Sequence, residues 1–319
     1  MIDVLTSTKF VVDKSTSVKI QEKEINKLVS TVKPDDLKVS EIDLAENKWE
    51  TEELIQITFI FNAINYCFWA RPGEEKWAVD INGKKLDGAI ALYRALEQEV
   101  KRNPDFVTGD YLESLSIKDL NRVLQGNIEI SLLKERAECL NEAGRVLKSK
   151  FKGSFIGVYK SSEGDAIVMA DLLISNFERF NDISAFDGKV VGFYKRAQLN
   201  SKMISDLCSS KGDKPLSNLD KLTAFADYKI PQKLRNLGIL EYSDDLSRKI
   251  DSYVLIEPDS KEEVEIRSAT VWAVELIKQR LAKTFDFVTS SHIDSMFWNL
   301  SQTKNNGEKP YHRTLTIAY

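Results

Sequence analysis

Histidine and cysteine are scarce in this chain of 319 residues. The two histidines, His292 and His312, do not have the spacing of metal ligands. Cys67, Cys139 and Cys208 are odd in number and form no CxxC pair, which argues against a disulfide framework and a zinc site. A histidine-based catalytic triad is equally disfavoured. Any catalysis would therefore be carried by carboxylates and lysines, and we expect neither a metal nor a cofactor.

A long apolar run is also missing. No stretch approaches the roughly 20 residues that a membrane-spanning helix needs, and the N-terminus lacks the basic, apolar and small-residue pattern of a secretion signal. The absence of paired cysteines fits a reducing compartment. The sequence therefore predicts a soluble, cytoplasmic protein with no membrane partner.

Charges of one sign do not gather in blocks. The formal net charge is -4 and Lys and Arg are spread evenly, which argues against tight binding to a nucleic-acid backbone. A small or locally charged ligand fits this distribution better. With 42% hydrophobic residues, the chain can bury the core of one large domain or of two intimate ones. We expect residues 1–319 to form a single domain and a monomer.

Hydrophobic periodicity predicts a mostly helical fold. Residues 1–34 are expected to form an arm that packs on the body and holds a helix starting at Ser17. Residues 52–69 are apolar nearly all the way round, which predicts a buried central helix. Residues 151–159 are compatible with a strand or an irregular passage. Further helices are expected over residues 89–100, 111–114, 116–126, 131–150, 165–180, 195–207, 260–283 and 292–300.

The sequence has one clear hairpin signal, Asn82-Gly83. This pair supplies the two positive-φ residues of a type I′ turn. We therefore expect one small β-hairpin or sheet beside the helices.

The rest of the chain is organised around Asp227. It lies among Phe225, Ala226, Tyr228 and Ile230, where a carboxylate is desolvated unless a polar or charged group faces it. A catalytic carboxylate arises in such surroundings. The alternative is that Asp227 caps the following helix through backbone N–H groups.

A helix–hairpin–helix is expected directly after Asp227, over residues 231–250. Pro231 suits the first turn of a helix, and Gly238 is a natural left-handed stop. Ser243 can then cap a second helix.

Lys195 and Arg196 stand at the start of a predicted helix, embedded in aromatic and apolar residues. A helix N-terminus with two basic side chains makes an anion site that would suit a phosphate. The alternative is a surface pair whose stems cover apolar neighbours.

Two further positions are candidates for ligand contact. Asp294 and Trp298 are four residues apart and share a helix face, where an acid beside an indole could hold a flat, cationic ligand. Trp69 could belong to the core or to the floor of a pocket. Three charged residues among the apolar positions of the 260–283 helix instead predict a satisfied structural network: Glu265, Arg267 and Glu275.

Taken together, several strings resemble the queuosine-salvage protein family. They occur in order over nearly the whole chain and are far more specific than any short motif above. They are Asn65-Tyr-Cys-Phe-Trp69, Phe193-Tyr-Lys-Arg-Ala-Gln198, Thr223-Ala-Phe-Ala-Asp-Tyr-Lys-Ile-Pro-Gln232, Glu263-Val-Glu-Ile-Arg267 and the closing Tyr311-His-Arg313.

The resemblance implies a mostly helical fold related to the helix–hairpin–helix DNA glycosylases, and hydrolysis of queuosine 5′-monophosphate to queuine and ribose 5-phosphate. Asp227 would be the catalytic carboxylate and Lys195 a ligand of the sugar phosphate. Phe225 would stack on the base, with Tyr228 beside it. Asp294, with Trp298 on the same face, would meet the polar or cationic substituent of queuine.

This chemistry suits a chain with few histidines. Breaking the C1′–N9 bond gives the ribose oxocarbenium character, which a preplaced carboxylate stabilises. The rival functions are a DNA-repair glycosylase, which predicts a basic face, and a helical interaction protein without chemistry, which predicts an ion-paired Asp227 and no pocket beside it.

Overall fold

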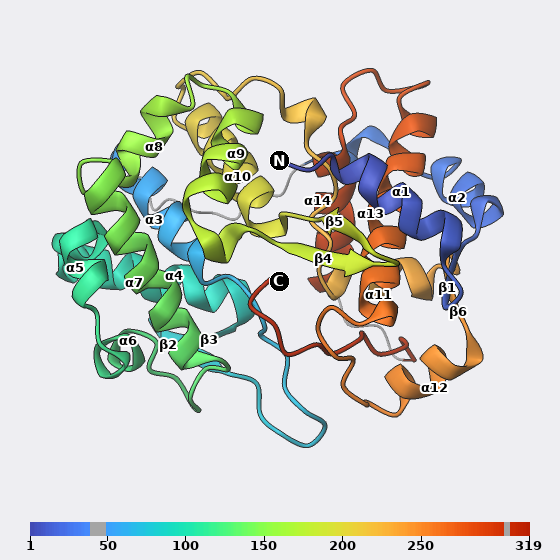
Figure 1. The fold of residues 1–319 in the computed structure, drawn as a ribbon, viewed down its shortest axis with the longest axis horizontal. Helices are drawn as coiled ribbons and strands as arrows, with labels where there is room; N and C mark the ends of the chain where they lie inside the picture. Colours follow the sequence, from blue (N-terminus) through green and yellow to red (C-terminus); the bar gives the residue numbers. More distant parts are fainter. Residues whose placement is uncertain (39–48, 303–306) are drawn as a thin grey trace.

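The computed structural model describes residues 1–38, 49–302 and 307–319, and helices dominate it, as predicted (Figure 1). The α-helices of the described chain are α1 (Val4–Lys14), α2 (Glu22–Val29), α3 (Thr51–Ala63), α4 (Gly88–Arg102), α5 (Gly109–Ser114), α6 (Ile117–Val123), α7 (Leu133–Lys150), α8 (Phe155–Ser161), α9 (Ala166–Asn176), α10 (Lys195–Ser210), α11 (Lys229–Asn236), α12 (Asp244–Asp251), α13 (Lys261–Leu281) and α14 (Ser290–Gln302). Short 3-10 helices are η1 (Pro34–Leu37), η2 (Pro104–Val107), η3 (Glu178–Phe180) and η4 (Leu219–Lys221). No described helix combines the length and the apolarity needed to cross a membrane.

The predicted hairpin is present. Strands β2 (Ala78–Ile81) and β3 (Lys84–Asp87) pair antiparallel. Asn82 and Gly83 connect them with φ of 54° and 78°, as a type I′ turn requires.

The expectation of a single hairpin is wrong, because the described residues form three two-stranded sheets. Strands β4 (Ile183–Phe186) and β5 (Lys189–Gly192) pair around Asp187 and Gly188, whose φ values are 45° and 77°. Asp-Gly is as good a type I′ signal as Asn-Gly, so this second hairpin was readable from the sequence.

The N-terminal arm differs from its prediction. Residues Val18–Ile20 form strand β1, which pairs with β6 (Leu240–Tyr242), and the helix expected from Ser17 begins at Glu22. A partner more than 200 residues away overrides the local helical pattern. Helix α1 precedes this strand, and α1 and α2 both contact α13, so the N-terminal and C-terminal helices lie side by side (Figure 1).

Helix α3 is buried along almost its whole length and contacts α4, α7, α8 and α10, as expected of a central helix. It ends at Ala63, earlier than the prediction of residue 69. Buried Arg136 donates hydrogen bonds to the carbonyls of Ile64 and Tyr66, and Cys67 has a φ of 50°. The backbone that leaves α3 is therefore held by side-chain partners instead of helical hydrogen bonds.

Residues 151–159 form no strand, and they are irregular only before α8 begins at Phe155. Ser154 caps α8 by accepting a hydrogen bond from the backbone N–H of Ile156. The apolar run has helical spacing toward its end, and Phe155 stacks on Phe59 of α3 with ring centroids 4.1 Å apart. This packing favours a helix over a strand.

The segment after Asp227 forms two helices, α11 and α12, with strand β6 between them. Gly238 follows α11 with a φ of 71°, and the Ser243 side chain caps α12 by accepting from the N–H of Leu246. Both local signals are confirmed.

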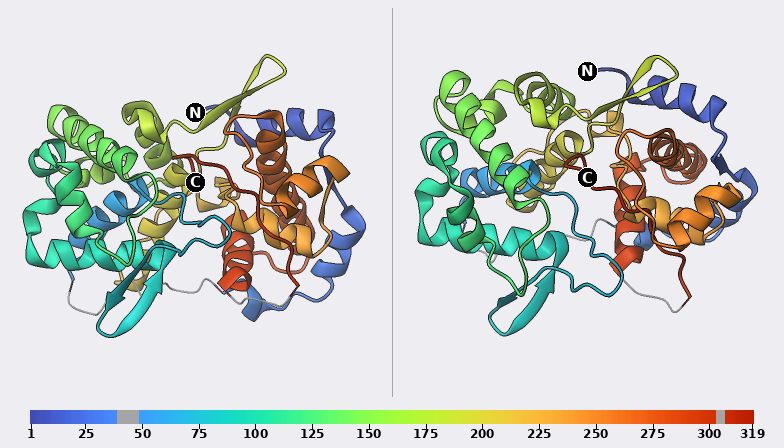
Figure 2. Two further views of the ribbon diagram at one scale, coloured as in Figure 1. Left: turned by 90° about the horizontal axis from the view of Figure 1, so that it is seen from below. Right: turned by 60° about the horizontal axis from the view of Figure 1, so that its bottom comes forward.

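Buried apolar side chains form two clusters. The larger one is built mainly from α3 to α10, and the smaller one from α2 and α11 to α14. Residues 224–230 contribute side chains to both clusters. The C-terminal segment, residues 311–319, runs between the two groups of helices (Figure 2), and the carbonyl of Tyr319 accepts a hydrogen bond from the N–H of Cys67 at 2.9 Å. The expectation that this segment docks on the body is confirmed.

Candidate active site

A cavity of about 730 Å³ lies where the two apolar clusters meet. Its walls come from the backbone after α3, the start of α4, α10, residues 225–229, α14 and the last residue of the chain. The chemistry-bearing residues among its lining include Asn65, Lys76, Asp87, Lys195, Lys202, Asp206, Phe225, Asp227, Tyr228, Lys229, Asp294, Trp298 and Tyr319. Six of the seven predicted site residues line it, and the exception is Trp69.

Asp227 is half-buried at the start of α11. Its Oδ1 accepts hydrogen bonds from the backbone N–H groups of Lys229, at 2.7 Å, and Ile230, at 3.0 Å. The capping interpretation is therefore correct for this oxygen. Within the described residues Oδ2 accepts no hydrogen bond and Asp227 has no ion pair, so the same carboxylate also offers an oxygen to the cavity that it lines.

The carboxylate that burial affects most is Asp294, in the first turns of α14. Its Oδ1 accepts a hydrogen bond from the N–H of Phe225 at 2.9 Å. Burial raises the pKa of Asp294 to about 8, and the negative charge of Asp227 adds to this increase. Trp298 lines the same cavity one turn further along α14, as their spacing predicts.

Lys195 and Arg196 have different surroundings. Lys195 is the first residue of α10 and lines the cavity, where its ammonium has no hydrogen bond or ion pair within the described residues. Burial lowers the pKa of Lys195, and the charge of Asp227 opposes that decrease. Arg196 instead donates to the backbone carbonyls of Ala63 and Arg179. Of these two neighbours, only Lys195 is therefore available to an anion in the cavity.

The α10 wall of the cavity extends about three turns beyond Lys195. Leu199, Lys202 and Asp206 also line the cavity, and the Lys202 ammonium pairs with the Asp206 carboxylate. The sequence analysis missed these residues, although their spacing of four, seven and eleven positions from Lys195 places all of them on one helix face.

Aromatic side chains close the cavity around Asp227. Phe225 and Tyr228 line it, and the ring of Tyr228 packs against Tyr311 with centroids 5.0 Å apart. Burial, followed by the charge of Asp227, raises the pKa of Tyr228 well above its ordinary value. Trp69 belongs to the larger apolar cluster, and its indole N–H donates to the carbonyl of Thr314 at 3.3 Å. The core interpretation of Trp69 describes its observed place.

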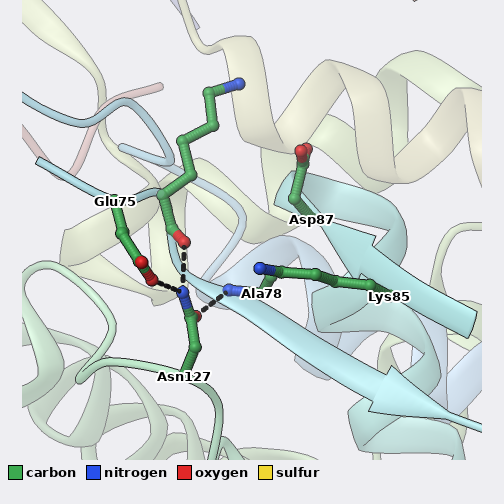
Figure 3. Close-up of a pocket in the computed structure, with 6 residues that line it drawn as sticks. Glu75, Ala78, Lys85, Asp87 and Asn127 are labelled. Atoms are coloured by element: carbon green, nitrogen blue, oxygen red, sulfur yellow. Dashed lines mark hydrogen bonds between the residues drawn. The ribbon is translucent and has the colours of Figure 1, made fainter.

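A smaller pocket of about 380 Å³ lies beside the β2–β3 hairpin (Figure 3). The side-chain amide of Asn127 donates to Glu75 Oε2 at 2.6 Å and its carbonyl accepts from the N–H of Ala78 at 2.7 Å. Lys76 and Asp87 line this pocket and the large cavity. None of the predicted site residues lines the smaller pocket.

Metal binding finds no support in the described part of the chain. It contains no group of three or more His, Cys, Asp or Glu side chains arranged to hold a metal ion. The cavity instead brings together carboxylates, ammonium groups and aromatic rings.

The chain matches known proteins over most of its length. A family model described as queuosine salvage protein matches residues 45–319. A relative from Sphaerobacter thermophilus is 33% identical over 323 residues, which cover 100% of this chain and 98% of the relative. A relative from Mus musculus is 31% identical over 272 residues, with 82% and 80% covered, and one from Schizosaccharomyces pombe is 25% identical over 342 residues, with 97% and 94% covered. Each bears the name queuosine 5′-phosphate N-glycosylase/hydrolase. The resemblance seen in the sequence is confirmed, and the chain belongs to the queuosine salvage protein family.

Proposed function

We propose that this protein hydrolyses the N-glycosidic bond of queuosine 5′-monophosphate and releases queuine and ribose 5-phosphate. The observation that carries the proposal is one cavity lined by Asp227, Lys195 and Asp294, in a chain whose relatives are named for this type of reaction. A carboxylate, an ammonium group and a second carboxylic acid are the functional groups that a ribose, a phosphate and a polar base require.

Asp227 faces the ribose in this proposal. As the C1′–N9 bond breaks, its electron pair leaves with the base and positive charge develops on the sugar. Two backbone N–H groups hold Oδ1 of Asp227, so the carboxylate needs no reorientation to stabilise that charge. Water then supplies hydroxide to C1′ and a proton to the departing base. A 7-deazapurine has carbon at position 7, so protonation of N7 cannot assist departure, and more of the barrier is lowered by Asp227 and substrate positioning.

Lys195 binds the 5′-phosphate. Its ammonium is buried and has no partner among the described residues, which disfavours the charged form. A phosphate dianion restores a partner through a charge-assisted hydrogen bond. Such remote binding energy holds the ribose in register with Asp227.

The base occupies the part of the cavity lined by Asp294, Trp298 and Phe225. Phe225 and Tyr228 provide apolar surfaces for a flat ring system. With a pKa of about 8, Asp294 is largely protonated at neutral pH before the base binds. A cationic substituent of the base favours ionised Asp294, so binding releases a proton from this carboxyl group.

The proposal is tested by following release of free queuine from queuosine 5′-monophosphate by chromatography, with wild type beside Asp227→Asn. We expect the substitution to lower kcat by about 100- to 1000-fold, as removal of one preorganised transition-state contact does elsewhere. The asparagine oxygen can still accept from Lys229 and Ile230, so the start of α11 should persist.

Asp165→Asn is the matched control for this experiment. Asp165 caps α9 in the same way, with Oδ1 accepting from the N–H groups of Ile167 and Val168, and it does not line the cavity. The Asp165→Asn protein should release queuine at the same rate as wild type. If wild type releases no queuine from either the nucleotide or the nucleoside, the hydrolase proposal is wrong. Release that survives Asp227→Asn would assign the chemistry to another carboxylate.

We also propose a fold relation, a location and an oligomeric state for this protein. The α11–β6–α12 segment supports a relation to helix–hairpin–helix DNA glycosylases, in a single-domain cytoplasmic monomer that binds a nucleotide and no nucleic acid. Sedimentation should give the 36.3 kDa of one chain. Retention of duplex DNA or tRNA on a filter with salt-dependent affinity would contradict the absence of a nucleic-acid partner.

A further inference from the structure

One buried guanidinium connects the backbones that carry Asp227 and Lys195. Arg267 of α13 donates from Nε to the carbonyl of Ala226 at 3.3 Å. Its Nη1 and Nη2 donate to the two carboxylate oxygens of Asp182 at 2.8 and 2.6 Å. Ala226 directly precedes Asp227, so one end of this planar group holds the peptide next to the proposed catalytic carboxylate.

Asp182 holds the other backbone. Its Oδ2 accepts from the N–H of Lys195 at 3.1 Å, and its carbonyl accepts from the N–H groups of Phe193, at 3.0 Å, and Tyr194, at 3.3 Å. Tyr194 has a φ of 53°, a left-handed conformation that is unfavourable for a residue with a side chain. Three hydrogen bonds to one aspartate therefore hold the strained turn from which Lys195 enters the cavity.

Arg267 has little freedom to move. Only 1% of its surface is exposed, and its guanidinium lies 3.9 Å from the ring centroid of Phe193 and 4.6 Å from that of Tyr319. Glu263 adds an ion pair at 3.6 Å from the preceding turn of α13. Neither Arg267 nor Asp182 lines the cavity, so neither is within reach of a bound nucleotide.

We propose that Arg267, acting through Asp182, is a positioning residue that sets the separation between Asp227 and Lys195. The inference rests on the proposed function, in which these two side chains hold the ribose and its phosphate. The Arg267 guanidinium is planar and all three of its nitrogens donate hydrogen bonds. Its geometry therefore fixes the backbone before Asp227 and the backbone before Lys195 at once. A displacement of about 1 Å in such a site can lower a rate by about 100-fold.

The test uses Arg267→Lys, which keeps the positive charge and replaces the planar guanidinium with a single ammonium group. Steady-state kinetics on queuosine 5′-monophosphate, normalised to the folded fraction, should give a kcat lowered by about 100-fold with a KM close to that of wild type. Phosphate and base contacts still bind the substrate, while Asp227 no longer matches the transition state. Asp182→Asn, which removes the charge at the same shape, should lower kcat in the same direction.

Arg235→Lys is the matched control. Arg235 also forms a two-pronged pair with a carboxylate, at 2.7 and 3.0 Å from Asp251, and it is nearly as buried, but it does not line the cavity. Its substitution should lower the free energy of unfolding comparably and leave kcat unchanged. Equal kcat losses in the two variants, or a wild-type kcat in Arg267→Lys, would overturn the positioning role and leave a structural one.

A readout without turnover separates this inference from the proposed function. In crystal structures of wild type and Arg267→Lys, the peptide between Ala226 and Asp227 should move relative to the first turn of α10 by about 1 Å. Superposition of both segments within coordinate error would overturn the inference, whatever reaction the protein performs. Absence of turnover in wild type together with the displacement would refute the proposed function and retain the positioning role.

Discussion

The two carboxylates of the cavity differ in how the fold surrounds them. Asp227 is half-buried and held by backbone N–H groups, whereas Asp294 is buried and has a pKa raised to about 8. An acid with this pKa must take up a proton on folding at neutral pH, and this uptake opposes folding. In the proposed function Asp294 contacts the base, so function and stability would conflict at this residue.

Asp294→Asn should stabilise the protein at high pH. In wild type the pKa of Asp294 is higher in the folded than in the unfolded protein. Its ionisation therefore lowers the free energy of unfolding increasingly from about pH 4 to pH 8 and has no effect below about pH 4. Asparagine can keep the hydrogen bond from Phe225 and has no proton to gain. Denaturant unfolding should show a free energy of unfolding that is raised by about 5 kcal/mol at pH 8 and changes little at pH 4. An equal effect at the two pH values would show that the ionisation of Asp294 is not its cause.

Lys195→Met should impair hydrolysis of the nucleotide more than hydrolysis of the nucleoside. Loss of a charge-assisted hydrogen bond to phosphate should raise the KM for queuosine 5′-monophosphate by about 10- to 100-fold and leave the nucleoside reaction unchanged. Lys229→Met is the comparison, because Lys229 also lines the cavity and is close enough to Asp227 for the two charges to interact. If only Lys229→Met shows the nucleotide-specific loss, the phosphate is bound by Lys229 and not by Lys195.

At the scale of elements, close helix contact depends on small residues. Helices α5 and α7 pack so closely that a Cβ on Gly144 would lie 2.2 Å from the N of Glu113 and 2.7 Å from the carbonyl oxygen of Gly109. Both are backbone atoms, which cannot move aside as a flexible side chain can. The glycine is thus needed for the approach of α5 to α7.

Gly144→Ala should lower the free energy of unfolding by about 2 kcal/mol. The clash outweighs the gain of about 1 kcal/mol that alanine brings to a helix interior. Urea unfolding followed by circular dichroism measures the change. Ser149→Ala, at an exposed position of the same helix, is the control and should be nearly neutral. A Gly144→Ala protein as stable as the control would mean that α5 and α7 are less closely packed.

At the scale of the whole molecule, the C-terminal segment connects the two apolar clusters and the cavity. His312 is buried, and its Nε2 lies 3.1 Å from the hydroxyl of Tyr319, which lines the cavity. Burial, with a smaller effect from the positive charge of Arg267, lowers the pKa of His312 to about 3. The folded protein therefore keeps this imidazole neutral at pH values where the unfolded chain protonates it.

Acid should weaken the fold through His312. The pKa of His312 is lower in the folded protein than the unfolded value of 6.5. Its contribution to the free energy of unfolding is therefore complete above pH 6.5 and decreases as the pH falls toward 3. Between pH 7 and pH 5 the expected loss is about 2 kcal/mol. His312→Gln should reduce this decrease, and comparing slopes removes any constant effect of the substitution. An unchanged slope would exclude His312 as the titrating group.

Much of the local structure could be predicted from the sequence. The cap at Ser243, the Asn82-Gly83 turn and the stop at Gly238 are present as expected. Each depends on residues within a few positions of one another, so the chain specifies it locally. The family strings likewise contain Asp227 and Lys195, and the four-residue spacing of Asp294 and Trp298 places both on one helix face.

The tertiary structure alone decided which partners these residues meet. Strand β1 forms because β6 lies beside it, and Asp294 is buried next to Phe225, 69 residues away, whose N–H donates to its carboxylate. Lys195 lines the cavity while its neighbour Arg196 binds backbone carbonyls. Burial and charge pairing depend on groups that folding brings together from distant parts of the chain, and no local pattern encodes their distances. The sequence by itself determined the helices, their caps and the family, and the packing determined the electrostatics of the site.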